Sequence, residues 1–163
     1  MSNKGNLNLE EELVTSHIDS QTLVRSVIEE IYNNGNLNLA DEIAASHYVA
    51  HDPTLINTGT GSMGLKNHAT ALRTAFPDLR LNIEDMHWDR ETVTTRLTAQ
   101  GTHNGTLLNI RATGRSVRTT GIFVSYVMKG KLTETYINWD ALGVLQQLGV
   151  VENLGQTKSA GAS

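Results

Sequence analysis

The stretch "TGRSVRTTGIFVSYVMKGKLTETYINWD", residues 113–140, decides the fold of this chain. Both of its halves are rich in β-branched and aromatic residues, which favour strands. The halves meet at Lys129–Gly130, and a glycine-containing pair between two such runs is typical of a β-hairpin with a two-residue turn. We therefore predict two long antiparallel strands, with Met128 and Lys131 paired beside the turn.

The register counted from this turn predicts which side chains share a face of the hairpin. Ser125 lies opposite Glu134 in it, and Phe123 lies opposite Tyr136. Alternate residues of a strand point to the same face, so one predicted face combines aromatic rings with polar groups, as ligand pockets do: Phe123, Ser125, Glu134, Tyr136, Asn138 and Asp140. The opposite face, available as core or as a dimer surface, carries Val124, Tyr126, Thr133, Thr135, Ile137 and Trp139.

Two helices are predicted before the strands. Apolar residues recur at helical spacing over residues 23–32 and again over residues 65–76. Gly35 suits the position just after the first helix. Pro77 ends the second helix, because a proline disfavours the helical state of the residue before it.

Shorter elements complete the pattern. Residues 38–45 predict a short helix, and "HYVAHD", residues 47–52, predicts an extended segment. Apolar and polar residues alternate over residues 79–83 and 93–99, which predicts two further strands. Residues 140–149, "DALGVLQQLG", predict a closing helix. Helices followed by consecutive antiparallel strands indicate an α+β fold with helices on one face of a curved sheet.

The length of 163 residues suits one domain, which we place at residues 19–152. The segment "GNLNLEEELVTSH", residues 5–17, is echoed by "GNLNLADEIAASH", residues 35–47. Two copies do not make a solenoid, so we expect residues 1–18 to be an N-terminal extension. The low hydrophobicity of residues 153–163 predicts a disordered tail.

The amino-acid composition indicates which classes of partner and which cellular compartment to expect. The net charge of −4 without a basic stripe argues against nucleic acid as a partner. No window approaches the roughly 20 apolar residues of a membrane helix, and the N-terminus lacks the apolar core of a signal peptide. The absence of cysteine excludes disulfides and thiolate chemistry and suits a reducing compartment. We expect a cytoplasmic protein with a small-molecule substrate, no nucleic acid and no membrane partner.

Several motifs, taken in order, resemble the SnoaL-like polyketide cyclase family. They are "AHDP", "GLKNHATALRTAFPDLRLNIED", "VTTRLTAQGTHNG", the hairpin stretch above and "LGVLQQLG", and together they cover residues 23–150. The resemblance implies the cone-shaped α+β fold of nuclear transport factor 2, with a curved antiparallel or mixed sheet around an apolar pocket. It also implies a homodimer, because this fold commonly forms one through the outer face of the sheet.

The activity that the resemblance implies is cofactor-independent ring closure by intramolecular aldol chemistry, or isomerisation, of a polyketide-like or other apolar oxygenated substrate. By position, the family's catalytic carboxylate corresponds to Asp140. Aspartate before a helix is also a favoured N-cap, and both roles can coexist. His51, His103 and Asn138 are the candidate hydrogen-bond donors for an enolate, with the histidines also able to act as acid or base.

The remaining candidates shape or line the pocket. Phe123, Tyr136 and Trp139 would supply its aromatic wall, and Ser125 and Arg96 would supply polar contacts. Arg96 has the alternative of pairing with Asp85 or Glu84, and His51 and His103 have the alternatives of a solvated strand end and an ordinary loop residue. Asp52 before Pro53 favours a turn start.

No metal site is expected, because His51, Asp52 and His103 include no closely spaced histidine pair. The chain departs from the family at "TTGIFVSYVM", which has no histidine, at "ATG" and at "GTLL". These departures leave two alternatives open: a hydrolase or hydroxylase of a small ligand on the same fold, and a non-catalytic ligand-binding or dimerisation module.

Overall fold

The computed structural model describes residues 20–152 and shows a mixed α+β fold. The chain is helical from residue 20, and the second part of this helix is the π-helical segment η1. The elements are η1 (Val27–Asn33), α2 (Leu39–Ile43), β1 (Ala44–His51), α3 (Gly61–Ala75), β2 (Arg80–Asp89), β3 (Thr92–Thr102), β4 (Ser116–Met128), β5 (Lys131–Trp139) and α4 (Ala141–Leu148). The predicted order of helices, strands and a closing helix is confirmed.

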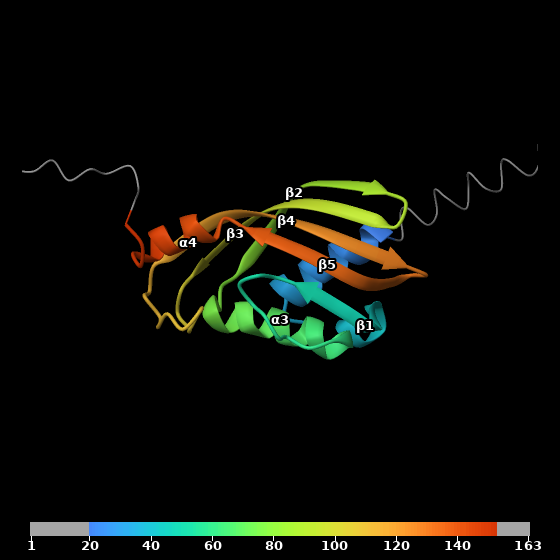
Figure 1. Cartoon of the computed structure of the whole chain (residues 1–163), viewed down its shortest axis with the longest axis horizontal. Coiled ribbons are helices and arrows are strands. Elements are labelled where there is room, and N and C mark those ends of the chain that lie inside the picture. Colours follow the sequence, from blue (N-terminus) through green and yellow to red (C-terminus); the bar gives the residue numbers. More distant parts are fainter. Residues whose placement is uncertain (1–19, 153–163) are drawn as a thin grey trace, which may run out of the picture.

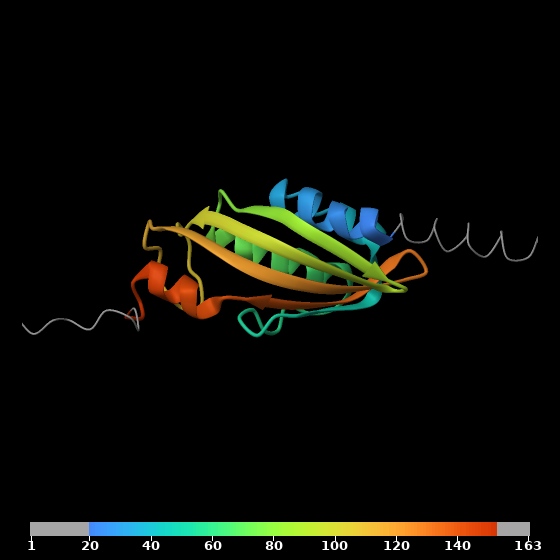
Figure 2. The ribbon, with the colours of Figure 1, turned by 90° about the horizontal axis from the view of Figure 1, so that it is seen from above.

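The strands form one five-stranded sheet in the order β1-β5-β4-β3-β2. β1 runs parallel to β5, and the other neighbours are antiparallel. The sheet curves around α3 and the N-terminal helix, and α4 lies at one end of it, just after β5 (Figures 1 and 2). None of the helices in residues 20–152 is long and apolar enough to cross a membrane.

The core fills the space between the two longer helices and the concave face of the sheet. The stripe predicted on α3 is buried there, with Leu65 and Ala69 fully buried. Leu97 and Phe123 meet this stripe from the sheet side. Burial of a leucine or phenylalanine side chain contributes roughly 1.5–3 kcal/mol, so the apolar face of α3 determines where this helix docks.

The short helix predicted over residues 38–45 ends earlier than expected. α2 stops at Ile43, and Ala44 has the extended dihedrals φ −83 and ψ 137. Ala44 pairs with Leu132 of β5, so Ala44 and Ala45 belong to β1. The pairing of β1 with the distant strand β5 outweighs the helix propensity of the two alanines. A local sequence pattern contains no information about this pairing.

The hairpin register was predicted correctly at the turn and wrongly beyond it. Met128 pairs with Lys131, and the two turn residues have positive φ values of 50 and 72. The register then shifts between Tyr126 and Val127, because Thr133 is an extra residue in β5. The Thr133 hydroxyl donates to the carbonyl of Tyr126 at 3.2 Å. Such a β-bulge moves every later residue of the strand to the opposite face.

The bulge exchanges the predicted faces of β5. Phe123 pairs with Ile137 and Ser125 with Thr135, so the concave face carries Phe123, Ser125, Thr135, Ile137 and Trp139. Glu134, Tyr136 and Asn138 lie on the outer face instead. The prediction that Tyr136 and Asn138 share a pocket face with Phe123 was therefore wrong.

Both ends of α4 follow the prediction. The Asp140 carboxylate accepts a hydrogen bond from the Gly143 amide at 2.9 Å, which caps the helix N-terminus. Gly149 closes the helix in the left-handed conformation, with φ 76. The predicted extension over residues 1–18 and the predicted tail over residues 153–163 lie outside the described residues.

Candidate active site

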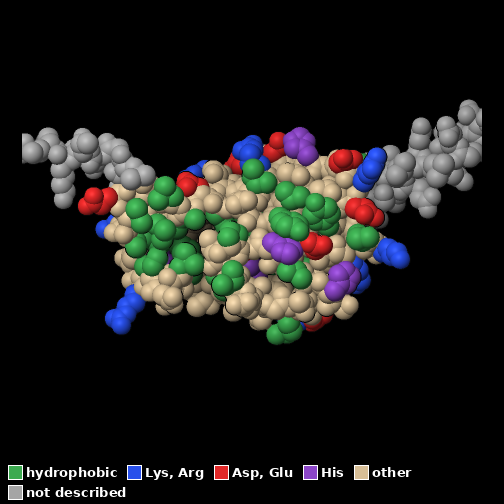
Figure 3. All heavy atoms as spheres, in the orientation of Figure 1, with side chains coloured by type: hydrophobic (Ala, Val, Ile, Leu, Met, Phe, Trp, Pro, Cys, Tyr) green, Lys and Arg blue, Asp and Glu red, His purple; other side chains and the backbone are tan. Residues whose placement is uncertain are grey.

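An apolar cavity opens at the end of the sheet where α4 lies. The empty space in and in front of it amounts to about 660 Å³, open solvent included. Its walls come from the end of α3, the start of β2, the end of β3, the start of β4, the end of β5 and α4: Thr54, Leu72, Phe76, Leu79, Leu81, Ala99, Gln100, Gly101, Leu107, Leu108, Val117, Thr119, Trp139, Ala141, Val144 and Leu145. Figure 3 shows the mouth as a hollow among hydrophobic side chains beside α4. A space of this kind suits an apolar ligand of a few rings.

Helix α4 forms one wall of the cavity. The side-chain amide of its Gln147 makes hydrogen bonds to β4 in the place of a neighbouring strand. β5 pairs with β4 only as far as Trp139 and Gly121, so the backbone of Arg118 has no strand beside it on that edge. The Gln147 amide fills this place: it accepts from the Arg118 N–H and donates to the Arg118 carbonyl, both at 2.9 Å. The wall is therefore attached to the sheet by paired amide hydrogen bonds as well as by apolar contact.

Trp139 brings an aromatic wall and a polar group to the cavity. Its indole lies against Gly121, where a Cβ would collide with Cε3 and Cζ3 of the ring. Phe123 holds the indole from another side, in a T-shaped contact with ring centroids 5.2 Å apart. Nε1 of Trp139 is buried and has no hydrogen-bond acceptor among residues 20–152. The predicted placement of Phe123 and Trp139 on different faces is thereby corrected.

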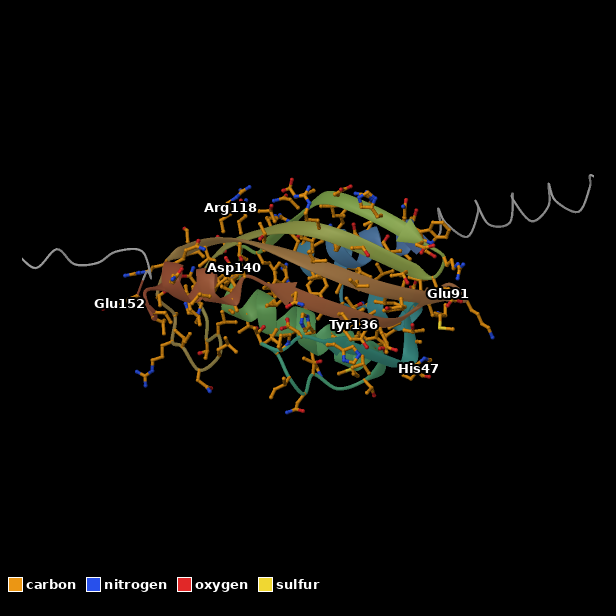
Figure 4. The ribbon with its side chains drawn as sticks, turned by 45° about the horizontal axis from the view of Figure 1, so that its top comes forward. His47, Glu91, Arg118, Tyr136, Asp140 and Glu152 are labelled. Atoms are coloured by element: carbon orange, nitrogen blue, oxygen red, sulfur yellow. The ribbon has the colours of Figure 1, made fainter. Side chains whose placement is uncertain are left out.

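Asp140 lies between two residues that line the cavity, Trp139 and Ala141. Figure 4 shows it at the junction of β5 and α4. The residue is exposed, and its Oδ1 is engaged in the cap of α4. Oδ2 makes no hydrogen bond within the described part of the chain, and the absence of a side chain at Gly143 lets the carboxylate lie close to the helix start. The structure thus shows the capping role, and Asp140 itself is not among the residues that line the cavity.

A buried polar chain lies deeper in the cone. His68 of α3 contacts Asp52 through Nε2 at 3.0 Å and the Tyr32 hydroxyl through Nδ1 at 2.9 Å. Asp52 also accepts from the Thr54 amide at 2.7 Å and from the Thr54 hydroxyl at 2.6 Å. The exposed fractions are 0% for His68, 1% for Tyr32 and 4% for Asp52, so water does not solvate these side chains.

The pKa shifts of Asp52 and Tyr32 indicate the protonation states of these two hydrogen-bonded side chains. Burial on its own raises the pKa of Asp52, but hydrogen bonds from His68 and Thr54 outweigh it, and the net shift is downward. Burial, followed by the nearby Tyr48 and Asp52, raises the pKa of Tyr32 well above its usual range. The carboxylate therefore accepts from Nε2–H of His68, and Nδ1 of His68 is hydrogen-bonded to the Tyr32 hydroxyl.

The predicted turn at Asp52 is confirmed, since its carboxylate accepts from the Thr54 amide two residues on. Sequence reasoning missed its partner, His68. The available signal was position: His68 lies three residues after Leu65 and four before Leu72, on the buried stripe of α3. A polar side chain on such a stripe requires a buried partner.

Ser125, one of the predicted pocket residues, lies in a second buried polar group. Its hydroxyl is 3.4 Å from that of Thr135, which is also hydrogen-bonded to Tyr48. Burial raises the pKa of Tyr48 to about 12, so its hydroxyl stays protonated. None of these three residues lines the cavity.

His103 is buried beside the cavity rather than in its wall. Nδ1 accepts from the Thr113 amide at 3.3 Å and lies 3.1 Å from the Thr113 hydroxyl. The proton of the neutral ring is therefore on Nε2, which has no acceptor within residues 20–152. Burial lowers the pKa of His103. The ring packs on Phe76, a cavity residue, with centroids 5.5 Å apart.

The remaining predicted site residues lie away from the cavity. His51 ends β1 on the outer face, where its Nε2 is 3.0 Å from Glu134 and its ring stacks on Tyr136 with centroids 4.3 Å apart. Asn138 is exposed on the same face. Arg96 is exposed and lies opposite Asp85 in the β2–β3 ladder, but the Asp85 carboxylate contacts His87 instead. The structure does not bring these residues together with Asp140.

No three metal-ligating side chains converge anywhere in the part of the chain that the structure describes. His51 lies on the outer face of the sheet, Asp52 is engaged with His68, and His103 lies beside Phe76.

A curved mixed sheet with helices on one face and an apolar cavity at one end define an α+β cone. Solved structures share this fold. TsrD from Streptomyces laurentii superposes with a TM-score of 0.73 at 23% identity, covering 82% of this chain and 96% of TsrD. A candidate polyketide cyclase from Acidithiobacillus ferrooxidans has a TM-score of 0.72 at 28% identity, with coverage of 80% and 94%. IdmH from Streptomyces antibioticus, also described as a candidate polyketide cyclase, has a TM-score of 0.68 at 25% identity, with coverage of 80% and 99%.

The family model of the SnoaL-like polyketide cyclases matches residues 22–148. The chain belongs to this family, which supports a cyclase or isomerase type of activity. No protein of curated function matches the sequence significantly.

Proposed function

We propose that the protein is a cofactor-independent cyclase that closes a ring of an apolar, polyketide-like substrate by intramolecular aldol chemistry. The observation that carries the proposal is the place of Asp140 in the chain, directly between two residues that line an apolar cavity, Trp139 and Ala141. The cavity takes the rings of the substrate, and the free Oδ2 of Asp140 supplies the base. A substrate that fills the mouth covers the carboxylate, and loss of water makes a carboxylate a stronger base.

The proposed reaction uses one proton twice. Asp140 removes a proton from a carbon next to a carbonyl, and the electron pair of that C–H bond moves to give an enolate. The enolate carbon attacks a second carbonyl of the same molecule, which forms the C–C bond and an alkoxide. The alkoxide takes the proton back from Asp140, so the carboxylate is regenerated and no redox partner is needed. Loss of water from the product then completes an aromatic ring.

The test uses an aromatic 1,5-diketone, 1-(2-acetylphenyl)propan-2-one, whose ring closure gives a fluorescent naphthol. We expect the wild-type protein to accelerate naphthol formation and Asp140→Asn to abolish most of the acceleration, by about 100-fold or more. Asparagine is as good an N-cap as aspartate, so Asp140→Asn removes the base and keeps the cap.

Asp140→Ala is the matched control for the capping role. It removes both functions and is expected to lower the free energy of unfolding by about 1 kcal/mol, as losing a cap does. If Asp140→Asn retained the wild-type rate while the protein remained folded, the assignment of Asp140 as the base would be wrong.

A non-catalytic ligand-binding module is the second candidate, and one observation favours it. The cavity wall consists almost entirely of apolar side chains. Asp140 is exposed, and its Oδ1 already accepts the hydrogen bond that caps α4. The same experiment separates the two functions: saturable binding of the diketone without acceleration of its ring closure supports the binding module.

We infer in addition that the protein forms a homodimer through the outer face of the sheet. Ile122, Tyr126, Met128 and Tyr136 of β4 and β5 lie on this face and are 47%, 37%, 45% and 47% exposed. Figure 3 shows hydrophobic side chains gathered there, apart from the cavity mouth. A contiguous apolar surface of this kind is typical of an interaction site.

A further inference from the structure

Leu108, in the wall of the cavity, has a backbone conformation that suits a leucine poorly. Within residues 20–152, five residues other than glycine have a positive φ: Asn57, Arg90, Leu108, Asn109 and Lys129. Leu108 is the one apolar residue among these five, with φ 49. A residue with a Cβ loses free energy in this left-handed region, and asparagine tolerates the region better than leucine does. Strain of this kind in the wall of a ligand cavity indicates a functional reason for the residue.

The positive φ of Leu108 comes from a tight turn in the loop between β3 and β4. The Leu107 amide donates to the Ile110 carbonyl at 3.0 Å, and the Ile110 amide donates to the Leu107 carbonyl at 2.7 Å. The two residues between them, Leu108 and Asn109, have φ values of 49 and 65, as in a turn of type I′. Such turns favour asparagine, aspartate and glycine, so Asn109 fits its position and Leu108 does not.

The two ends of this loop are fixed to each other and to α3. The amides of Asn104 and Gly105 both donate to the Ala75 carbonyl at the end of α3, at 3.0 Å. The His103 amide donates to the Arg115 carbonyl at 2.9 Å, which closes the loop at its base. Figures 1 and 2 show this loop at the same end of the sheet as α4. The turn therefore has a defined place beside the cavity.

The exposure of the wall residues separates the floor of the cavity from its mouth. Leu79, Leu81, Leu107 and Val117 line the floor, since they are between 3% and 8% exposed. Leu108 lines the same cavity and is 44% exposed. Its side chain therefore lies at the mouth, where a ligand can reach it from the cavity and water can reach it from outside.

We propose that Leu108 is a specificity residue of the cavity, which contacts the outer part of a ligand that extends from the floor to the mouth. The inference rests on the proposed function and narrows its substrate class to extended polycyclic or chain-bearing compounds. A small ligand that fills only the floor gains nothing from Leu108. A longer ligand covers apolar surface that water otherwise reaches, which favours binding in proportion to the covered area. The turn holds the side chain in place before the ligand binds, which reduces the entropic cost of binding.

The test compares two uncharged fluorescent probes of different length, naphthalene and N-phenyl-1-naphthylamine. Their dissociation constants are measured by fluorescence titration for the wild type and for Leu108→Ala, which removes most of the side chain. We expect Leu108→Ala to weaken binding of N-phenyl-1-naphthylamine about tenfold and binding of naphthalene by less than about twofold. Equal weakening for the two probes, or unchanged binding of the longer probe, would overturn the inference.

Lys129→Ala is the matched control for the turn position. Lys129 is the first residue of the two-residue turn between β4 and β5, with φ 50, and it does not line the cavity. The change should leave both dissociation constants unaltered. A loss of affinity for the longer probe in Lys129→Ala as large as in Leu108→Ala would count against a contact made by Leu108.

A glycine variant separates the backbone strain from the contact with the ligand. Leu108→Gly lacks the side chain and also the Cβ that disfavours a positive φ. Its equilibrium constant of unfolding in urea should be about fivefold lower than that of Leu108→Ala, while it binds the longer probe as weakly. Equal stability of the two variants would remove the strain on which the inference depends, and wild-type affinity of Leu108→Gly would refute the contact.

A second measurement uses the wild type alone and so does not depend on the folding of a variant. In ¹³C-labelled protein, the methyl resonances of Leu108 should shift with N-phenyl-1-naphthylamine and stay in place with naphthalene. Methyl resonances that ignore the longer probe would overturn the inference. If neither probe bound the wild type, the proposed function of the cavity would be overturned with it. A length preference that depends on Leu108, without any ring closure of the diketone, would leave the inference standing and refute only the cyclase activity.

Discussion

At the scale of single residues, the polar groups of the interior have separate tasks. The Tyr32–His68–Asp52–Thr54 chain is buried and fully paired, and only Thr54 reaches the cavity wall. Asp52 ends the extended segment after β1, and His68 lies on α3, so their contact links two elements that are distant in sequence. A buried pair of this kind costs desolvation and stabilises mainly by making alternatives unfavourable.

The pKa of Asp52 predicts a specific dependence of stability on pH. Since the folded-state pKa lies below the unfolded value of about 3.9, the ionised Asp52 stabilises the fold above that value. This stabilisation is lost as the pH falls below about 4 and through the folded pKa. Asp52→Asn should therefore lower the free energy of unfolding at pH 7 by roughly 1–3 kcal/mol and flatten its decline in acid.

Urea unfolding of wild type and Asp52→Asn between neutral pH and about pH 3 measures this effect. Glu91→Gln, a change at an exposed carboxylate that Figure 4 labels, is the control and should reproduce the wild-type curve. An Asp52→Asn curve parallel to the wild-type curve throughout would show that Asp52 does not titrate as proposed.

At the scale of elements, the bulge in β5 and the glycine in β4 together place Trp139. The extra residue Thr133 turns Trp139 to the concave face. Gly121, its partner across the ladder, leaves room for the indole to lie over the neighbouring strand. β5 ends directly after Trp139, and Gln147 of α4 takes over the pairing at Arg118. The cavity wall thus depends on where one strand stops.

Gly121→Ala is predicted to disturb this wall. The new methyl group would overlap with Cε3 and Cζ3 of Trp139, so the indole must move, and overpacking of this kind costs about 1–3 kcal/mol. The cost should be smaller in a Trp139→Leu background, because the colliding ring is gone. Thermal or urea unfolding of the two single variants and the double variant measures this coupling.

The exposed Thr120→Ala, on the same strand, is the control and should change stability by less than about 0.5 kcal/mol. Additive effects of Gly121→Ala and Trp139→Leu would argue against the direct contact on which the geometry of the wall depends.

At the scale of the whole molecule, the sheet has two apolar surfaces with different uses. The concave surface encloses the core and the cavity, and the outer surface over β4 and β5 exposes Ile122, Tyr126, Met128 and Tyr136. His51 and Glu134 lie on that outer surface beside Tyr136. The outer surface leads us to expect a symmetric dimer, because a self-complementary patch pairs with its own copy.

Tyr136→Glu is predicted to separate such a dimer into monomers. A charge placed in an apolar interface is expensive to bury, so the dissociation constant should rise by about 100-fold or more. Sedimentation equilibrium of wild type and variant measures it. Ile56→Glu, at a loop residue that is 74% exposed and outside this surface, should leave the dimer unchanged, and a wild-type protein that is monomeric at every concentration would refute the interface.

Much of the fold was predictable because its signals are local. The stripe on α3, the alternation in β2 and β3, the Lys129–Gly130 turn and the two caps of α4 are all properties of neighbouring residues. Periodicity and turn chemistry act over a few residues, so they can be read from the chain. The resemblance to the SnoaL-like polyketide cyclases added the curved sheet and the pocket, and the family is confirmed.

The site was less predictable, because its residues are placed by distant contacts. One inserted residue, Thr133, moved Tyr136 and Asn138 out of the expected pocket face and brought Trp139 in. The partnership of Asp52 with His68 depends on the docking of α3 against β1, and no local pattern contains that contact. The sequence by itself determined the elements, their order and the cap at Asp140. Only the tertiary structure decided which side chains face the cavity, because strand register and helix docking are set by packing across the whole core.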